Sequence, residues 1–328
     1  MTLGAAVLGE PLDATLEASL RAADMACYMA KEKGRNRVQV YHADDSELSL
    51  RFGEMAWVQR LHMALEENRF CLYSQEITAL GRTEHDGGHI EILLRLHDEA
   101  GRMILPDSFI PAAERTGLIV PLGAQILEQA CRQQAAWIQA GLQPVPVAVN
   151  VSPVQLLEAQ FPARVLHTLK QHAVPPAAIT LEITESAAVT HMEQALVHIR
   201  QLREQGVAVA LDDFGTGFSS LNMLRSLPLQ TVKIDRSLVD PMPEAEAVAV
   251  VRAICDLASA LRLDVVAEGV ESPEHAQSAR EAGCQALQGF LYARPLEVSA
   301  ATDWLRAAQL AAHGPVQALI SGRLPTSV

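Results

Sequence analysis

The stretch VAVALDDFGTGFSSL, residues 207–221, decides the fold. It opens as a short apolar run typical of a β-strand, reaches the adjacent acids Asp212 and Asp213, and continues into a glycine-rich segment. Successive strand residues point to opposite faces, so an acid pair inside a strand would bury at least one charge. The pattern predicts that the strand ends at Leu211 and that both carboxylates face an open mouth, where their repulsion favours a bound cation. Taken alone, the stretch is equally typical of a polar turn after a core strand.

Charge and cysteine content exclude several classes of protein. The 328 residues carry 26 Lys and Arg against 39 Asp and Glu, a formal net charge of −13, which argues against a general surface for DNA, RNA or anionic membranes. The five cysteines stand singly, without CxxC spacing, as is typical of reduced thiols in a cytoplasmic protein. No apolar run is long enough to span a bilayer and no signal-peptide pattern is present, so we expect a cytoplasmic chain with no membrane segment. These observations concern this chain alone and do not exclude a membrane anchor elsewhere in a longer parent protein.

Strands and helices alternate along most of the chain. Strands are expected at 70–77, 90–96, 146–151, 179–184, 207–211, 231–234, 264–267 and 286–288. Helices are expected between them at 118–140, 153–172, 192–205, 219–224, 244–261 and 273–282, and after them at 300–311. This alternation predicts a parallel sheet, and eight such strands match a (β/α)8 barrel of the TIM type. An open doubly wound sheet is the alternative, but no GxGxxG or Walker A motif follows any strand.

Polar residues gather at the expected strand ends, where a barrel of this type carries its chemistry. They are Glu91, Arg95, Asn150, Glu182, Glu185, Asp212, Asp213, Lys233, Asp235, Glu268, Glu271 and Gln288. Carboxylate and amide oxygens without His or Cys favour Mg²⁺ or Mn²⁺ over zinc. The surplus of carboxylates predicts two ions, the arrangement that clamps a phosphoryl group for in-line displacement. Lys233 would activate water or neutralise phosphate and Arg95 would fork onto a phosphate oxygen; the alternative for each is an ordinary ion pair.

Several long motifs give the chain a family likeness. From about residue 51 to residue 303 it resembles the EAL-domain cyclic di-GMP phosphodiesterases. The matching segments are EILLR at 91–95, FIPAAE at 109–114, NVSPVQL at 150–156, LEITES at 181–186, LDDFGTGFSSL at 211–221, VKID at 232–235, AEGVE at 267–271 and QGFLYARPL at 288–296. Their number and fixed order argue against chance. The resemblance implies a TIM-like barrel with one antiparallel strand, near 70–77, and hydrolysis of cyclic di-GMP to linear pGpG.

The resemblance also implies roles for individual residues. The first metal ion would be held by Glu91, Asn150, Glu182 and Asp212. The second would be held by Asp212 and Asp213, with Glu268 and Gln288 near it, partly through water. Lys233 would orient or deprotonate the attacking water, so the expected catalytic groups are Glu91, Asp213, Lys233 and Glu268. Substrate contacts would come from Gln75, Arg95, Asp235 and Gln288. Glu185 and Glu271 would contact the metal ligands without binding the metal themselves, and Glu185 would stabilise the loop 213–220.

The chain departs from the family pattern in two segments. The signature triplet reads Glu91-Ile92-Leu93, with isoleucine where the family has alanine. Ile92 faces away from a neighbour that points at the metal, so we expect it to pack into the barrel wall with little effect on catalysis. Residues 74–76 read SQE where the family often has YQP. Gln75 is kept, and Glu76 in place of proline is expected to alter local substrate contacts but not the metal ligands. The loop after Asp213 is intact.

The first 45 residues differ from the rest. Residues 20–38, LRAADMACYMAKEKGRNRV, resemble the C-terminal end of a GGDEF diguanylate cyclase domain, but no GGDEF signature is present and no cyclase activity is expected. The alternative is an amphipathic helix belonging to the EAL domain itself. We expect a GGDEF remnant with linker at 1–45, the EAL barrel at 46–312 and a flexible tail at 313–328. A parent protein with upstream GGDEF and sensory domains and a homodimeric state are further expectations.

Two other functions compete with the phosphodiesterase. A catalytically silent cyclic di-GMP receptor would be expected to lose acids of the metal site, and the chain keeps all of them. A barrel glycosidase needs two carboxylates and aromatic residues that stack on sugars, yet only 4% of residues are aromatic. The surplus of acids together with Lys233 and Arg95 favours a metal site acting on an anionic substrate.

Overall fold

The computed structural model describes residues 3–6, 38–41, 57–80, 89–142, 145–185, 192–216 and 221–313. These residues group into two compact units, one drawn from 1–67 and 109–118 and the other from 68–108 and 119–328. Most of the segment 20–38 and the tail from 314 onward lie outside the described residues. The GGDEF remnant, the flexible tail and the domain boundaries therefore remain predictions.

The smaller unit contains a few short elements. Strand β1 (Leu3–Ala6) pairs in parallel with β2 (Val38–Tyr41). Residues 57–66 are helical, and α3 (Ile110–Thr116) ends at Gly117, whose φ of 75° is the left-handed conformation that glycine adopts at helix ends. The rings of Trp57 and Phe109 lie 6.0 Å apart and join the helical residues to the segment before α3.

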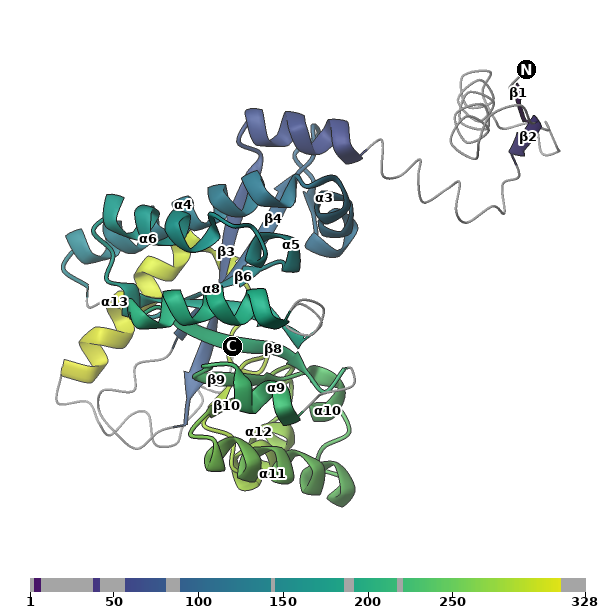
Figure 1. Ribbon diagram of the computed structural model, residues 1–328. Helices are drawn as coiled ribbons and strands as arrows, with labels where there is room; N and C mark the ends of the chain where they lie inside the picture. Colours follow the sequence, from purple (N-terminus) through teal and green to yellow (C-terminus); the bar gives the residue numbers. More distant parts are fainter. Residues whose placement is uncertain are drawn as a thin grey trace, which may run out of the picture. The chain divides into compact units, whose positions relative to one another are not determined.

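The larger unit is a closed barrel (Figure 1). Its strands are β3 (Phe70–Ala79), β4 (His89–His97), β6 (Val147–Val151), β7 (Ile179–Thr184), β8 (Ala208–Phe214), β9 (Thr231–Ile234), β10 (Asp264–Ala267) and β11 (Ala286–Leu287). They pair in the order β3-β11-β10-β9-β8-β7-β6-β4, and pairing between β3 and β4 closes the ring. Strand β3 runs antiparallel to both of its barrel neighbours. The predicted TIM-like barrel with one antiparallel strand is confirmed.

Helices follow the strands and cover the barrel. They are α4 (Ile119–Gln139), α5 (Pro153–Leu156), α6 (Phe161–Gln171), α8 (Met192–Glu204), α9 (Leu221–Ser226), α10 (Arg236–Val239), α11 (Ala245–Ala260), α12 (Pro273–Ala282) and α13 (Val298–His313). The strands are buried on both faces because helices lie on the outside and side chains fill the inside. Among the described helices, none combines the length and apolarity needed to cross a membrane.

Some elements differ from the sequence prediction. The single helix predicted over 153–172 is wrong, because the chain forms α5, a turn and then α6. Ser152 caps α5 by accepting hydrogen bonds from the backbone N–H groups of Val154 and Gln155. Pro162 stands in the first turn of α6, where a missing N–H leaves no hydrogen bond unmade. Two short edge strands, β5 (Met103–Ile104) on β4 and β12 (Leu296–Glu297) on β3, were also not predicted.

Candidate active site

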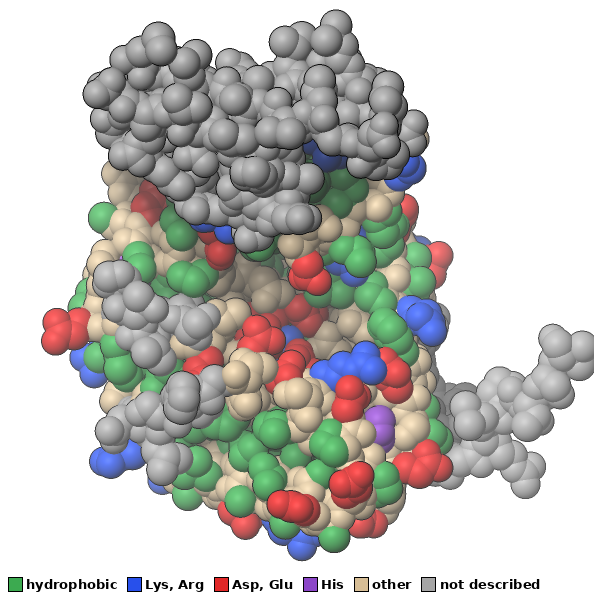
Figure 2. Space-filling model, turned by 90° about the vertical axis from the view of Figure 1, so that its right-hand side faces the viewer, with side chains coloured by type: hydrophobic (Ala, Val, Ile, Leu, Met, Phe, Trp, Pro, Cys, Tyr) green, Lys and Arg blue, Asp and Glu red, His purple; other side chains and the backbone are tan. Residues whose placement is uncertain are grey.

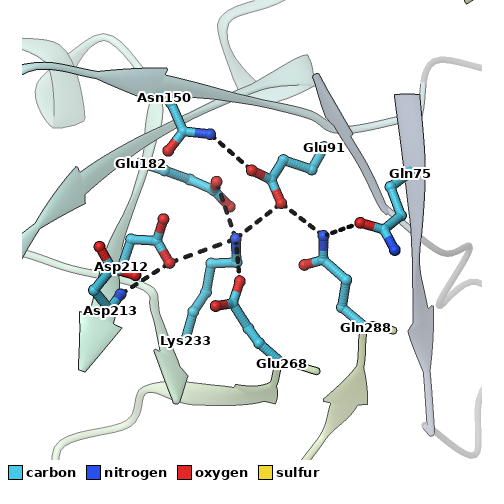
Figure 3. Close-up of polar contacts among 9 residues, drawn as sticks. All are labelled: Gln75, Glu91, Asn150, Glu182, Asp212, Asp213, Lys233, Glu268 and Gln288. Carbon is cyan, nitrogen blue, oxygen red and sulfur yellow. Dashed lines mark hydrogen bonds and ion pairs between the residues drawn. The ribbon is translucent and has the colours of Figure 1, made fainter. Parts of the chain in front are cut away.

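Polar side chains from neighbouring strands converge inside the barrel (Figure 3). Figure 3 labels Gln75, Glu91, Asn150, Glu182, Asp212, Asp213, Lys233, Glu268 and Gln288. The strand register brings them together, since Gln75 lies opposite Glu91 on β3 and β4, and Asn150 lies opposite Glu182 on β6 and β7. Residues opposite one another on paired strands share a face of the sheet. Acidic side chains also gather near the centre of the molecular face drawn in Figure 2.

The ammonium of Lys233 lies among four of the carboxylates. Its Nζ is 3.1 Å from Oε2 of both Glu91 and Glu182, 2.6 Å from Glu268 Oε1 and 3.6 Å from Asp212 Oδ1. The side chain is 1% exposed. Burial alone would lower the pKa of Lys233, but the surrounding carboxylates outweigh it and raise that pKa well above its ordinary value. Lys233 therefore keeps its proton at neutral pH.

Glu91 is held by three donors. Asn150 Nδ2 donates to Glu91 Oε1 at 2.7 Å, while Gln288 Nε2 at 2.6 Å and Lys233 Nζ both donate to Oε2. Gln288 Nε2 also donates to Gln75 Oε1 at 3.2 Å, and Gln75 Nε2 donates to the Ala293 carbonyl at 2.9 Å. A chain of hydrogen bonds thus fixes the orientation of Glu91.

A β-bulge brings the adjacent acids Asp212 and Asp213 to the same site. The predicted end of the strand at Leu211 is wrong, because β8 continues through both acids to Phe214. The pairing of β8 with β9 shifts register between Leu211 and Phe214, and Asp213 adopts the left-handed conformation with φ 57°. A bulge suspends the alternation of faces, so ligand oxygens of Asp212, Asp213 and Glu268 lie within 4.8 Å of one another.

All the carboxyl groups of the cluster except Glu91 bind protons more tightly than usual. Burial, reinforced by the negative charge of Glu91, raises the pKa of Glu182 well above its ordinary value. Burial and neighbouring acids raise the pKa of Glu268 to about 8 and that of Asp213 to about 6. For Glu91, burial works in the same direction, but Lys233 and the hydrogen bonds outweigh it and lower the pKa. A divalent cation that binds here would release protons, so its affinity would increase with pH.

The donor set fits a divalent cation. The oxygens of Asp212, Asp213 and Glu268 stand close enough to share an ion. Gln288 Oε1 is buried and has no hydrogen-bond partner among the described residues, and an unpaired buried acceptor costs free energy. A cation, or a water bound to one, would supply that partner. Oxygen donors without His or Cys favour Mg²⁺ or Mn²⁺.

Comparison with known proteins gives the family. A model described as the EAL domain matches residues 58–295. The chain belongs to the EAL domain family. The match spans every residue of the cluster, from the β3 strand to the segment after β11.

Relatives of this EAL domain have assigned activities. Over 278 residues it is 37% identical to the bifunctional diguanylate cyclase/cyclic di-GMP phosphodiesterase MucR of Pseudomonas aeruginosa, covering 84% of this chain and 40% of MucR. Over 305 residues it is 35% identical to the cyclic di-GMP phosphodiesterase NbdA of the same species, covering 92% of this chain and 38% of NbdA. The fold matches a structure of the PaMucR phosphodiesterase in complex with c-di-GMP, with a TM-score of 0.70 and 36% identity over 75% of this chain and 99% of that one. The matched part of the chain thus spans about two fifths of the length of these two relatives.

Other residues predicted for the site lie around the cluster. The Arg95 guanidinium lies 5.5 Å from the ring centre of Tyr73, further toward the carboxyl end of β4 than Glu91. Asp235 caps α10 by accepting from the Ser237 N–H at 2.9 Å, and its charge contributes to the raised pKa of Asp213. These positions place Arg95 and Asp235 outside the Lys233 contacts.

The two predicted supporting acids have different surroundings. Glu185 directly follows β7 and is 5% exposed. Glu271 is 38% exposed and pairs with Arg236, whose Nη1 lies 2.8 Å from Glu271 Oε1. Sequence reasoning did not predict Arg236 or the helix that it begins. The signal was present, since Asp235 is a favourable helix cap and Arg236 and Asp240 have the spacing of a helical ion pair.

Proposed function

We propose that this EAL domain hydrolyses cyclic di-GMP to linear pGpG in a metal-dependent reaction. The observation that carries the proposal is the Lys233 ammonium, which is buried among carboxylates from β4, β7, β8 and the segment after β10. The oxygens of this donor set suit Mg²⁺ or Mn²⁺. The assigned activities of MucR and NbdA, and the complex of PaMucR with c-di-GMP, support this substrate.

The metal site would use the predicted ligands. We assign Glu91, Asn150, Glu182 and Asp212 to one ion, and Asp212, Asp213 and Glu268 to a second, with Gln288 close by. When bound, the two cations would polarise the scissile phosphate and lower the pKa of the attacking water. The unpaired Gln288 Oε1 and the close oxygens of Asp212, Asp213 and Glu268 support this assignment.

Lys233 acts as a hydrogen-bond donor in the proposed reaction and keeps its own proton. Its raised pKa keeps it as an ammonium at neutral pH, so it orients the attacking water and stabilises negative charge on the phosphate. The carboxylate best placed to accept the proton from water is Glu268, whose Oε1 lies 2.6 Å from Lys233 Nζ. It would act in its ionised form, which bound cations favour. Of the two roles that the family resemblance implies for Lys233, these contacts favour orientation over deprotonation.

Substrate contacts would come from the rim of the barrel. The guanidinium of Arg95 has the fork geometry that matches a non-bridging phosphate oxygen. Gln75, Asp235 and Gln288 would contact the remainder of the nucleotide. Within the whole protein we propose a cytoplasmic location, a homodimer and upstream GGDEF and sensory domains. The greater length of the relatives supports the upstream domains.

The test is chromatography of products from the purified chain mixed with cyclic di-GMP. Mg²⁺, Mn²⁺ and EDTA conditions would be compared, with the isosteric Glu91→Gln variant as control. We expect pGpG with either cation and none with EDTA or in the variant. Tight binding of cyclic di-GMP without product would instead assign the chain to the silent receptors.

A further inference from the structure

Helix α10 lies between the end of β8 and the segment after β10, which carry the candidate ligands of the second cation. It directly follows β9, which pairs with β8 on one side and with β10 on the other. The Asp235 N–H donates to the Phe214 carbonyl at 3.2 Å, and the Glu268 N–H donates to the Ile234 carbonyl at 3.1 Å. The end of β9 is therefore hydrogen-bonded to the end of β8 and to Glu268, and the four residues of α10 start at that point.

One side chain of α10 packs on the loop after Asp213. Gly215 has φ 108°, and a Cβ added to it would lie 2.4 Å from Leu238 Cδ1. The Leu238 side chain thus packs against the backbone of Gly215, two residues after Asp213. A side chain at 215 would displace Leu238 and would itself be strained at that φ.

A second side chain of α10 packs on the loop after Glu268. Gly269 has φ 68°, and a Cβ added to it would lie 2.5 Å from Arg236 Cγ and 2.8 Å from Arg236 Cβ. The Arg236 guanidinium reaches Glu271 at 2.8 Å and Asp240 at 3.0 Å. Arg236 therefore contacts the segment that begins at Glu268 at two residues. Its aliphatic stem packs on Gly269, and its guanidinium pairs with Glu271.

We propose that Leu238 and Arg236 are positioning residues, which set the separation of the Asp212–Asp213 pair from Glu268 and so the affinity for a divalent cation. The inference rests on the proposed metal-dependent function. The oxygens of these three acids come from the end of β8 and from the segment after β10, yet lie within 4.8 Å of one another. Helix α10 contacts the chain just beyond each of these places at a glycine. Ion pairs as exposed as those of Arg236 stabilise a fold very little, so the close packing on the glycines carries most of the effect.

The experiment measures Mn²⁺ binding to the EDTA-treated, dialysed chain by titration calorimetry. Leu238→Ala, Arg236→Ala and the double variant would be compared with wild type. Matched controls are Leu196→Ala, a half-buried leucine on α8, and Arg252→Ala, an exposed arginine on α11. We expect each α10 variant to weaken binding about tenfold, as residues behind metal ligands commonly do, and the controls to stay within about twofold.

A second readout separates positioning from general destabilisation. If misplaced ligands are the cause, the hydrolysis lost in Leu238→Ala returns when Mg²⁺ is raised in proportion to the lost affinity. If Leu238→Ala fails to fold, Leu238→Met replaces it, because methionine has nearly the volume of leucine. Comparing Arg236→Gln with Arg236→Lys separates the effect of the charge from that of the side-chain stem. Affinity within about twofold of wild type in all the folded α10 variants would overturn the inference. A wild-type chain that binds no Mn²⁺ would overturn the proposed metal dependence as well.

Discussion

Replacing Lys233 by methionine removes the only ammonium from the carboxylate cluster described above while keeping most of the side-chain volume. Four carboxylates then face one another without the cation that now lies within 2.6–3.6 Å of each. Removing one partner of a buried ion pair costs about 3–5 kcal/mol. At roughly 2–4 °C per kcal/mol for a domain of this size, the unfolding temperature should fall by about 6–20 °C near pH 7.

The loss should shrink in acid. Without Lys233 the carboxyl groups take up protons instead, and near pH 5 most of their repulsion is gone. The assay is thermal unfolding in EDTA at both pH values, with Lys170→Met, an exposed lysine on α6, as the matched control. Hydrolysis by Lys233→Met should fall by about 10²–10³-fold, as for loss of one donor to a developing anion. An unfolding temperature equal to that of wild type near pH 7 would refute the pairing of Lys233.

Three further outcomes are expected. Folding raises the pKa of Glu268 to about 8 and that of Asp213 to about 6. Both groups therefore stabilise the folded state most when pH lies below their pKa in the unfolded chain, and stability in EDTA should fall as pH rises from about 4 to 8. A melting temperature that rises over this range would contradict the shifts. In Gly123→Ala the new Cβ would lie 1.7 Å from Gln155 Nε2 and would push the Gln155 amide off the Ser152 N–H, from which its Oε1 accepts a hydrogen bond. Calorimetry should detect the loss of that hydrogen bond, about 0.5–1.5 kcal/mol, while unchanged stability would rule out the close approach. Arg95→Lys should raise KM for cyclic di-GMP about tenfold with kcat nearly unchanged, because lysine lacks the guanidinium fork; an unaltered KM would exclude the phosphate contact.

The position of the acids could be predicted from sequence, but their local geometry could not. The order of strands and the residues at their ends placed Asp212 and Asp213 at the mouth. The sequence prediction reached this result by ending the strand at Leu211, whereas the chain continues to Phe214 through a bulge. The left-handed Asp213 depends on how β8 pairs with β9, and a strand's own residues carry little information about that pairing.

The environment of Lys233 also depends on distant segments. The sequence indicated a lysine at a strand end near acids, and the alternative of an ion pair was left open. Its burial and its contacts with Glu91, Glu182 and Glu268 arise from β4, β7 and the segment after β10, which meet only when the barrel closes. Helix α10 was not predicted because its four residues are too few for a helical pattern of apolar residues.

The most direct test of the proposed function is hydrolysis of cyclic di-GMP in water enriched in ¹⁸O with Mg²⁺ present. Attack of a water molecule oriented by Lys233 on phosphorus predicts pGpG carrying one ¹⁸O atom in its terminal phosphate, detected by mass spectrometry. Formation of pGpG without the label, or no Mg²⁺-dependent product at all, would contradict the assignment of this EAL domain as a hydrolytic phosphodiesterase.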